Sequence, residues 1–434
     1  MPYFDEKVET LPRDQLQQLQ LEKLQAMMTE MWGKNQFYTN KWKAAGVTPG
    51  DIKTLADLAK LPLTTKKELV QDQADNGPFG TNLTYSVDKY VRFHQTSGTT
   101  GKPLKVMDTD ESWDWWGKCW AYVLSGAGGT DRARVVVGCV CVHVVGCWAV
   151  VEGARKLGAS RVPGGGCDSI QRLELMKEMG ATALACTPTY AIRLAEVARE
   201  QGFDMSEIPM QRTIHAGEPG ANIPATKKRI EQAWHAKCFD HAGASEVGAH
   251  SFECEVQPGG THLIESEYIA EVLDPETLEP VAPGEKGELV ITNLGRWAFP
   301  VVRYRTGDVV RANLDRCECG RTFMRFDGGV IGRADDMVTV RGVNVFPAAV
   351  ENIIRQFNQV DEFRITVRTV KHMDEMEVEF ELEEGADEAV LNEINEKLYT
   401  MLGFRPKLRV VARDSLPRFD MKAKRFHVKK DVAA

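Results

Sequence analysis

Short Val-rich runs alternate with helical patterns between about residues 91 and 281 of this chain. RVVVGCVCV precedes a helical stretch at 149–157, SRVPGGG precedes SIQRLELMKEMG, and ALACTPT precedes YAIRLAEVARE. Strands that alternate with helices at this spacing predict parallel βαβ units. In such a sheet the ligand site lies at the carboxyl ends of the strands, and glycine clusters mark several of those ends here. The first expectation is therefore an α/β domain with a ligand site along one edge.

The pattern changes twice further along the chain. From residue 268 to 308, Asp-Pro and Pro-Gly turns without a long helix predict an antiparallel β subdomain at about 268–331. A helix at 347–357, strands at about 363–370 and 376–382, a helix at 388–402 and a strand at 407–412 then predict a small α+β domain. Because 434 residues exceed what one core usually sustains, we place a large domain at 1–332 and a small one at 333–434.

Charge and hydropathy exclude several classes of partner. The net charge is −8, whereas binding to a phosphate backbone depends on clustered Lys and Arg, so no nucleic acid partner is expected. The N-terminus is acidic and rich in glutamine where a secretory signal would be basic and then apolar. The apolar run at 135–151 falls short of about 20 residues and contains His143, which predicts a buried strand and helix and no membrane partner.

Cysteine usage indicates the compartment. Ten cysteines without a secretory signal are typical of a reducing, cytoplasmic location, where thiols stay free or bind metal. Cys139, Cys141 and Cys147 lie in apolar runs and are expected to be small core residues.

The segment VRFHQTSGTTGKPLKV contains a loop suited to an oligophosphate. Glycines let the backbone approach a phosphate, hydroxyls donate hydrogen bonds, and a lysine adds positive charge. The loop residues are Thr96, Ser97, Gly98, Thr99, Thr100, Gly101 and Lys102. It is not a Walker A loop, because Thr96 stands where that motif needs Gly and Pro103 stands where it needs Ser or Thr. The alternative is an ordinary Gly/Thr turn.

The loop TSGTTGKP resembles the signature of the acyl-adenylate-forming superfamily, which includes acyl-CoA synthetases, luciferases and the adenylation domains of peptide synthetases. Further matches follow in the expected order: AGEP at 216–219, HAGASEVG at 241–248, RYRTGD at 303–308, GRADDMVTVRGVNVFP at 332–347 and DMKAKRF near the C-terminus. RYRTGD and RGVNVFP are most similar to the phenylacetate-CoA ligase family. The resemblance covers roughly residue 61 to the C-terminus.

The resemblance implies a large AMP-binding domain and a small mobile domain that carries a catalytic lysine. It implies that ATP and Mg²⁺ convert a small carboxylic acid, aromatic or short and branched, to an acyl adenylate. CoA would then take the acyl group, with release of AMP and pyrophosphate. Relatives are often homodimers. Two other hypotheses stay open: an adenylating ligase that delivers the acyl group to a carrier-protein thiol or an amine, and a non-catalytic nucleotide-binding sensor.

The resemblance also assigns roles to individual residues. Glu246 would hold Mg²⁺ beside Ser245, Asp308 would bind the ribose hydroxyls, and Arg333 would contact ribose or phosphate. Lys422 would bridge the carboxylate and the α-phosphate, with Lys424 as the alternative, and Asp335 would be the hinge of the small domain. The other nucleotide-binding positions are Gly217, Glu218, Pro219, Asp240, His241 and Ala242.

Several of these assignments have a simpler alternative. Taken singly, Asp308 and Arg333 would be a turn carboxylate and a surface ion pair, and the basic tail around Lys422 would be a solvated end. The family usually stacks an aromatic residue on adenine where this chain has Ala242. Either His241 takes that role or apolar packing holds the base.

Two Cys/His pairs predict a structural zinc site. Cys254 and His262 flank a QPGG turn, and Cys317 and Cys319 form CECG. Together they can supply a tetrahedral set of three thiolates and one imidazole, which leaves no open position for chemistry. The alternative is a set of free surface thiols.

The acid pocket is expected near the ends of the central strands. In enzymes of the resembling family it forms after the strand and helix near 141–150 and around Tyr190 and the AGEP motif. The candidates are His143, Val144, Trp148, Tyr190 and His215. Trp148 and Tyr190 can equally be ordinary core residues, and His215 a hydrogen-bonded structural histidine.

Overall fold

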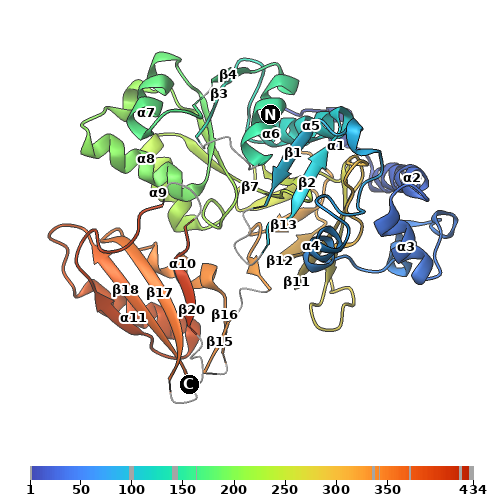
Figure 1. The fold of residues 1–434 in the computed structure, drawn as a ribbon. Coiled ribbons are helices and arrows are strands. Elements are labelled where there is room, and N and C mark those ends of the chain that lie inside the picture. The colour runs from blue at the N-terminus through green and yellow to red at the C-terminus, as the bar shows by residue number, and fades with distance from the viewer. Residues whose placement is uncertain are drawn as a thin grey trace.

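The computed structural model describes residues 2–96, 102–138, 145–162, 164–334, 338–341, 343–370, 373–419 and 423–429. Figure 1 shows a larger lobe, coloured blue to yellow, and a smaller lobe in orange and red. The observed architecture confirms the predicted α/β fold with an antiparallel β region and a separate C-terminal α+β unit.

The N-terminal helices form their own layer on the large lobe. They are α1 (Glu6–Glu9), α2 (Arg13–Met31), α3 (Gln36–Ala44) and α4 (Lys66–Asp75), with 3₁₀ turns at Pro49–Asp51, Leu55–Lys60 and Val87–Lys89. Residues of α2 at helical spacing, including Leu16, Leu24 and Met31, are buried. Leu24 and Met31 pack against α3 and against Leu294 and Val302 of the antiparallel region, and Leu16 lies in the cluster that includes α5 (Asp110–Gly126) and the central sheet, so the N-terminal layer and the sheet share a core.

The central sheet has the strand order β10-β11-β12-β13-β9-β8-β7-β6-β5-β3-β4, and β14 pairs with β12. Its parallel half contains β3 (Arg134–Val137), β4 (Ser160–Val162), β5 (Ala183–Cys186), β6 (Arg212–His215) and the first part of β7 (Lys237–Ala244). The helices between and beside these strands are α5 (Asp110–Gly126), α6 (Val145–Leu157), α7 (Ser169–Glu178), α8 (Pro188–Glu200) and α9 (Pro224–Trp234), with a 3₁₀ turn at Met205–Glu207.

Helices cover both faces of the parallel half (Figure 1). Side chains of α5 and α6 share one core cluster with the alternate strand residues Val135, Val137 and Ile214, whereas α7, α8 and α9 cover the opposite face. The helices α5 and α6 approach closely, because a Cβ at Gly153 would lie 2.3 Å from the Cβ of Trp120.

The antiparallel half continues directly from β7. It contains β8 (Gly248–Glu253), β9 (Gly260–Leu263), β10 (Tyr268–Leu273), β11 (Lys286–Asn293), β12 (Tyr304–Asn313), β13 (Arg325–Asp327) and β14 (Gly332–Arg333). Antiparallel pairing in this sheet therefore begins at residue 241, earlier than the predicted 268. The strand β7 pairs in parallel with β6 up to Asp240 and antiparallel with β8 from His241, so the pairing changes direction between these two residues.

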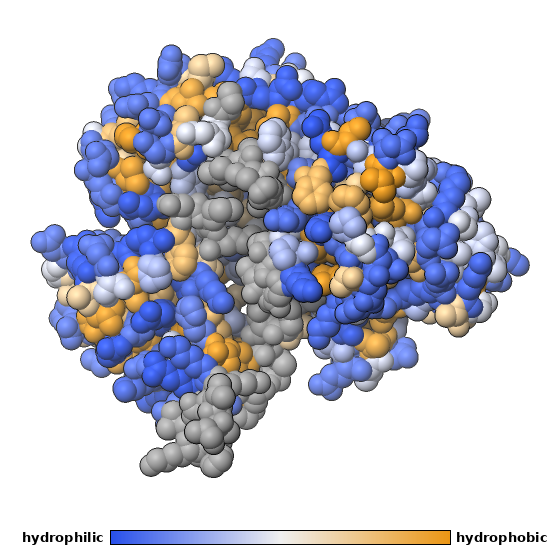
Figure 2. Space-filling model, viewed as in Figure 1, coloured by the Kyte–Doolittle hydropathy of each residue, from blue (hydrophilic) through white to orange (hydrophobic). Residues whose placement is uncertain are grey.

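A separate two-stranded ribbon carries the predicted phosphate loop. The strands β1 (Arg92–Gln95) and β2 (Lys105–Asp108) are antiparallel and lie on either side of residues 97–101, which are outside the described residues. Apolar side chains face solvent beside this ribbon (Figure 2), among them Val91 and Phe93 at 52% and 47% exposure.

The small lobe has its own sheet and core. Its elements are β15 (Val338–Val340), β16 (Val343–Val345), α10 (Pro347–Ile354), β17 (Val360–Val370), β18 (Met373–Leu382), α11 (Val390–Leu402), β19 (Lys407–Val410) and β20 (Phe426–Lys429). The sheet order is β19-β18-β17-β20, and a core cluster restricted to residues 338–426 fills it. Because β20 pairs in parallel with β17, residues 426–429 of the basic tail belong to the sheet and are not a solvated end.

Among the described residues, no helix combines the length and the apolar character needed to cross a membrane. Free thiols are recorded at Cys119, Cys167, Cys186, Cys238, Cys254, Cys317 and Cys319. Cys147 is a buried core residue, as predicted, but it is disulfide-bonded and not a free thiol.

Candidate functional site

The phosphate-loop ribbon fixes both ends of the predicted loop. The Thr96 N–H donates to the Leu104 carbonyl at 2.9 Å, and the Thr96 hydroxyl accepts from the Leu104 N–H at 3.0 Å. Thr96 is therefore used in closing the hairpin, and Lys102 is exposed beside it. The other predicted loop residues, Ser97, Gly98, Thr99, Thr100 and Gly101, lie outside the described residues.

Glu246 is a buried carboxylate with two partners that the sequence did not indicate. The Tyr304 hydroxyl donates to its Oε1 at 2.7 Å, and the Lys66 Nζ lies 3.3 Å from the same oxygen. Burial and the neighbouring carboxylate raise the pKa of Tyr304 well above its usual value, so the phenol stays a donor. A carboxylate that can exchange its lysine partner for a cation is a suitable Mg²⁺ ligand.

Lys66 reaches Glu246 because the segment before α4 is attached to the strand that carries Tyr304. The Thr64 N–H donates to the Arg303 carbonyl, and the Arg305 N–H donates to the Thr64 carbonyl, both at 2.8 Å. These bonds make a parallel bridge between Thr64 and Tyr304. Residues far apart in sequence are thereby fixed around one carboxylate.

A fully buried ion pair connects the phosphate-loop ribbon to the Glu246 turn. Arg296 contacts both carboxylate oxygens of Asp108 at 2.7 Å, and neither side chain is exposed. Its Nη1 donates to the Ser245 carbonyl at 2.7 Å. Since Asp108 ends β2, the arginine fixes the position of Ser245 and Glu246 relative to the ribbon. No local sequence signal identified Arg296 or Asp108 as parts of the site.

Asp308 and Arg333, which the resemblance assigns to the nucleotide, lie side by side in the structure. They are register partners on β12 and β14, and Arg333 Nη1 lies 3.2 Å from Asp308 Oδ1. Asp308 lies on the same strand as Tyr304, four residues later, which separates their Cα atoms by at most about 13 Å. Because the Tyr304 hydroxyl bonds to Glu246, the strand β12 carries both Asp308 and a direct contact to the Glu246 carboxylate.

Asp240 lies at the end of the parallel part of β7. Its Oδ2 would be 2.6 Å from a Cβ at Gly329, whose φ is +65°, so this approach requires glycine. Burial, followed by the nearby Glu253 carboxylate, raises the pKa of Asp240 to about 7. Glu253 itself accepts from the Asp240 N–H at 2.8 Å and is paired with Lys227 at 2.7 Å.

His241 points to the opposite face of β7 from Asp240. It is buried, its Nδ1 lies 2.6 Å from the Ser251 carbonyl, and its ring packs edge-on against Trp120 with centroids 4.5 Å apart. Burial lowers its pKa to about 4, so the ring is neutral and Nδ1–H donates. Strand alternation therefore places His241 in the core, which corrects its suggested stacking on adenine. Apolar packing beside the half-buried Ala242 is the alternative that agrees with this geometry.

The acid-pocket candidates are not brought together. Trp148 is 44% exposed on α6, whereas Tyr190 is buried on α8, which covers the opposite face of the sheet. On α6 its neighbours Cys147 and Ala149 take the buried positions, so Trp148 faces solvent, and its role as a pocket wall stays a prediction. His143 and Val144 lie outside the described residues.

Tyr190 and His215 both have protein partners. The Tyr190 hydroxyl contacts Arg172 and lies 3.2 Å from the Ser169 hydroxyl. His215 is fully buried, and its Nδ1 lies 3.2 Å from the Cys186 carbonyl. Burial lowers the pKa of His215 to about 4, which keeps it neutral. The contacts of Tyr190 agree with its structural alternative, whereas the buried Nε2 of His215 has no hydrogen-bond partner among the described residues.

The small lobe meets the AGEP motif through Glu218. Its Oε1 accepts from the Thr189 N–H at 2.9 Å, and its Oε2 accepts from the Ala423 N–H at 2.6 Å. In the same motif, Gly217 has a φ of +95°. The predicted catalytic Lys422, which precedes Ala423, and the predicted hinge Asp335 lie outside the described residues, and the alternative Lys424 is exposed.

The four predicted zinc ligands form one buried cluster. All of their ligand atoms lie within 4.8 Å of one another, with Cys254 Sγ 3.7 Å from Cys317 Sγ and Cys319 Sγ 3.6 Å from His262 Nε2. A tetrahedral zinc ion would separate two sulfurs by about 3.8 Å and a sulfur and a nitrogen by about 3.6 Å. The His262 Nδ1 lies 3.2 Å from the Phe323 carbonyl, which leaves Nε2 to face the cysteines. The donor set therefore fits zinc, and the thiols are not on the surface.

The N-terminal segment packs directly on the cysteine turn. The Tyr3 hydroxyl donates to the Cys319 carbonyl at 2.6 Å, and the Thr322 N–H donates to the Glu9 carbonyl at 3.0 Å. Arg321 forms a fully buried ion pair with Glu9. The cysteine turn thus stabilises the contact between the first residues of the chain and the antiparallel region.

Comparison with known families and proteins gives consistent matches. Residues 40–296 match the family described as AMP-binding enzyme, and residues 342–430 match the AMP-binding enzyme C-terminal domain. The phenylacetate-coenzyme A ligase of Escherichia coli is 33% identical over 439 residues, which covers 98% of each chain. That of Thermus thermophilus is 33% identical over 384 residues, covering 88% of this chain and 84% of the relative.

Solved structures of 2-hydroxyisobutyryl-CoA ligase resemble the chain, and the TM-score depends on the state in which that enzyme was solved. In its postadenylation state with 2-HIB-AMP, that enzyme matches with a TM-score of 0.93 at 30% identity, covering 99% of this chain and 92% of the other. In its thioesterification state with 2-HIB-AMP and CoA, it matches with a TM-score of 0.74 at 32% identity, covering 98% and 92%. The sequence identity is nearly the same, so the difference in TM-score reflects the arrangement of the parts.

Proposed function

The chain belongs to the AMP-binding enzyme family, and from that premise we propose that it activates a small carboxylic acid with ATP and transfers the acyl group to CoA. The products would be the acyl-CoA thioester, AMP and pyrophosphate. One observation carries the proposal: the segment that follows Lys422 meets the AGEP motif through Glu218 while the molecule has the arrangement of a postadenylation-state ligase. This contact supports a C-terminal ammonium group acting near a nucleotide site on the large lobe.

The residues around Glu246 support the first half-reaction. Attack of a carboxylate on the α-phosphorus joins two anions, so positive charge must reduce their repulsion. Bound Mg²⁺ would supply part of that charge, and Glu246 would hold it while Tyr304 and Arg296 fix the carboxylate and its turn. Lys422 would bring the second charge to the reacting carboxylate and α-phosphate.

The other end of the nucleotide would lie along β12 and β7. Asp308 would accept hydrogen bonds from the ribose hydroxyls, and Arg333 would contact ribose or phosphate from the neighbouring strand. Asp240, Ala242 and the AGEP backbone would surround adenine. Thr96 to Lys102 would surround the phosphates.

Four further assignments belong to the proposal. We place the boundary between the two domains at residues 332 and 333, with Asp335 as the hinge about which the small domain turns between half-reactions. We assign a structural zinc ion to Cys254, His262, Cys317 and Cys319 on the basis of their donor geometry. A homodimer and a cytoplasmic location stay predictions, which sedimentation and cell fractionation would test.

The acid is proposed to be small, and aromatic in preference to short and branched. The phenylacetate-CoA ligases support an aryl acid, whereas 2-hydroxyisobutyryl-CoA ligase, with similar identity, supports a short branched one. A carrier-protein thiol or an amine is the alternative acceptor, and the presence of Glu246, Asp308 and Lys422 argues against a non-catalytic sensor.

The test is CoA-dependent AMP release across a panel of aryl and short-chain acids. Wild type should release AMP with at least one acid, and Lys422→Ala should form adenylate at least about a hundredfold more slowly. Adenylate formation without stimulation by CoA would favour the alternative acceptor. If no acid caused release of pyrophosphate, the result would favour a non-catalytic nucleotide-binding sensor.

A further inference from the structure

Apart from residues 333 and 334, which are bonded to β12, only a few direct polar contacts join the small lobe to the large lobe among the described residues. The Ala423 N–H donates to Glu218 at 2.6 Å, Arg425 Nη1 lies 3.4 Å from the Thr189 hydroxyl, and Arg199 lies 3.9 Å from Glu383. The first two contacts meet, because the Thr189 N–H also donates to Glu218 at 2.9 Å. Glu218 and Thr189 thus form one cradle for the segment 423–425.

The segment in this cradle is firmly attached to the small lobe. Arg425 forms a two-point ion pair with Glu362 at 2.6 and 2.9 Å, and its guanidinium lies 5.6 Å from the ring centroids of Phe363 and Phe419. The strand β20 begins at the next residue. A bond to Ala423 therefore fixes the whole small lobe and does not merely hold a loose tail.

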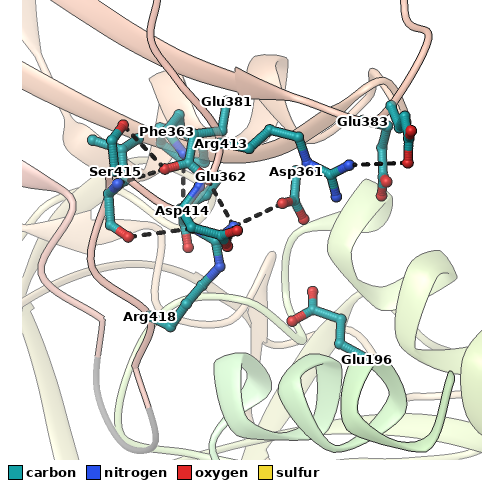
Figure 3. A network of polar contacts seen from close by, with 12 residues as sticks. Glu196, Asp361, Glu362, Phe363, Glu381, Glu383, Arg413, Asp414, Ser415 and Arg418 are labelled. Atoms are coloured by element: carbon teal, nitrogen blue, oxygen red, sulfur yellow. Dashed lines mark hydrogen bonds and ion pairs between the residues drawn. The ribbon is translucent and has the colours of Figure 1, made fainter. Parts of the chain in front are cut away.

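The charged side chains beside the cradle are satisfied within their own lobes. Figure 3 shows Arg418 bonded to its small-lobe neighbours, with Asp361 and Glu381 each at 2.7 Å. Across from it on α8, Glu196 is paired with Arg193 at 3.6 Å and with Arg229 at 3.4 Å. The lobes can therefore separate at this point without leaving these charges unpaired. These ion pairs do not favour one orientation of the small lobe, whereas the bonds of Glu218 and Thr189 to the segment 423–425 do.

We propose that Glu218, held by Thr189, is a positioning residue that docks the segment 423–425 in the orientation used for adenylation and takes no part in thioester formation. The inference rests on the proposed function and extends it from the nucleotide to the docking of the small domain. Glu218 is half-buried between the lobes, and both of its oxygens accept from backbone N–H groups, one from each lobe. Burial raises its pKa, which agrees with a carboxylate enclosed by the docked lobes.

The kinetic test separates the two half-reactions. Glu218→Gln should slow single-turnover adenylate formation roughly tenfold or more at saturating ATP, because one N–H then faces an amide donor. Thr189→Val should slow it a few-fold, because it removes the hydroxyl that contacts Arg425 and Glu218 and keeps the backbone N–H that donates to Glu218. Neither variant should change the rate at which supplied acyl adenylate reacts with CoA. The control is Glu200→Gln, an exposed carboxylate at the end of α8 that pairs only with Arg193 among the described residues.

Hydrogen exchange at the Ala423 amide supplies a readout that needs no substrate. Because Glu218 accepts from this amide, it should exchange at least about tenfold faster in Glu218→Gln than in wild type or in Glu200→Gln. Equal slowing of both half-reactions, a weakened Kd for ATP with an unchanged rate at saturation, or unchanged exchange at Ala423 would each overturn the inference. If wild type adenylates no acid, the proposed function fails, and the exchange measurement still decides the docking role.

Discussion

Replacing Arg296 with Met should destabilise the protein by about 3 to 5 kcal/mol, because it leaves the buried Asp108 carboxylate without its partner. The arginine donates to both oxygens of Asp108 and to the Ser245 carbonyl, each at 2.7 Å, and lies against Trp116 and Phe299. Methionine keeps much of the apolar contact and removes all three donors. At roughly 2 to 4 °C per kcal/mol, the apparent melting temperature should fall by roughly 6 to 20 °C.

Thermal and urea unfolding at neutral pH would measure the loss, with two matched variants. Arg155→Met removes a pair with Glu152 in which the arginine is 49% exposed, and should cost at most about 1 kcal/mol. The double variant Asp108→Leu with Arg296→Met removes both charges and should recover most of the lost stability. If Arg296→Met costs no more than Arg155→Met, or if the double variant is no more stable than the single one, the assigned role of the ion pair is refuted.

Three other perturbations test separate parts of the site. Lys66→Ala should change the concentration of Mg²⁺ needed for half-maximal ATP binding severalfold, because Glu246 loses its resident cation; Lys67→Ala, one residue further on α4, should not. Purified protein should contain about one zinc per chain by elemental analysis, and Cys317→Ser should lose it together with several degrees of thermal stability; retention of the metal would contradict the ligand set. Since the pKa of Asp240 is raised to about 7, its ionisation costs stability as pH rises from about 4 to 7; Asp240→Asn should flatten that decline in pH-dependent unfolding, and an unchanged slope would exclude it.

Most of the fold was predictable from the periodicity of apolar residues in the sequence. The βαβ alternation and the order of elements in the small lobe were predictable, because each strand and helix has its own local pattern of apolar residues. The strand β20 was not, because its residues read as a basic tail and become a strand only by pairing with β17. Pairing between strands so far apart in the chain has no local signature.

Site residues that lie in local sequence motifs were predictable, whereas residues that join the site only through long-range contacts were not. The four predicted zinc ligands converge as their spacing suggested, whereas the ion pair between Asp308 and Arg333 was not part of the roles that the resemblance assigned to them. Lys66 and Arg296 were missed because their partners, Glu246 and Asp108, lie about 180 and 188 residues away. His241 could have been assigned to the core from strand alternation alone, since Asp240 beside it faces the other side of β7.

The hydrogen bond between Tyr3 and Cys319 has a consequence for the synthesis of the chain in the cell. The hydroxyl and the carbonyl that meet there are separated by 316 positions, so the first residues to leave the ribosome must wait for nearly the last part of the large lobe. At roughly 5 to 20 residues per second, that interval lasts roughly 15 to 60 seconds. During it the helix α2 has no sheet to cover its apolar side, and a nascent-chain chaperone would find its target there.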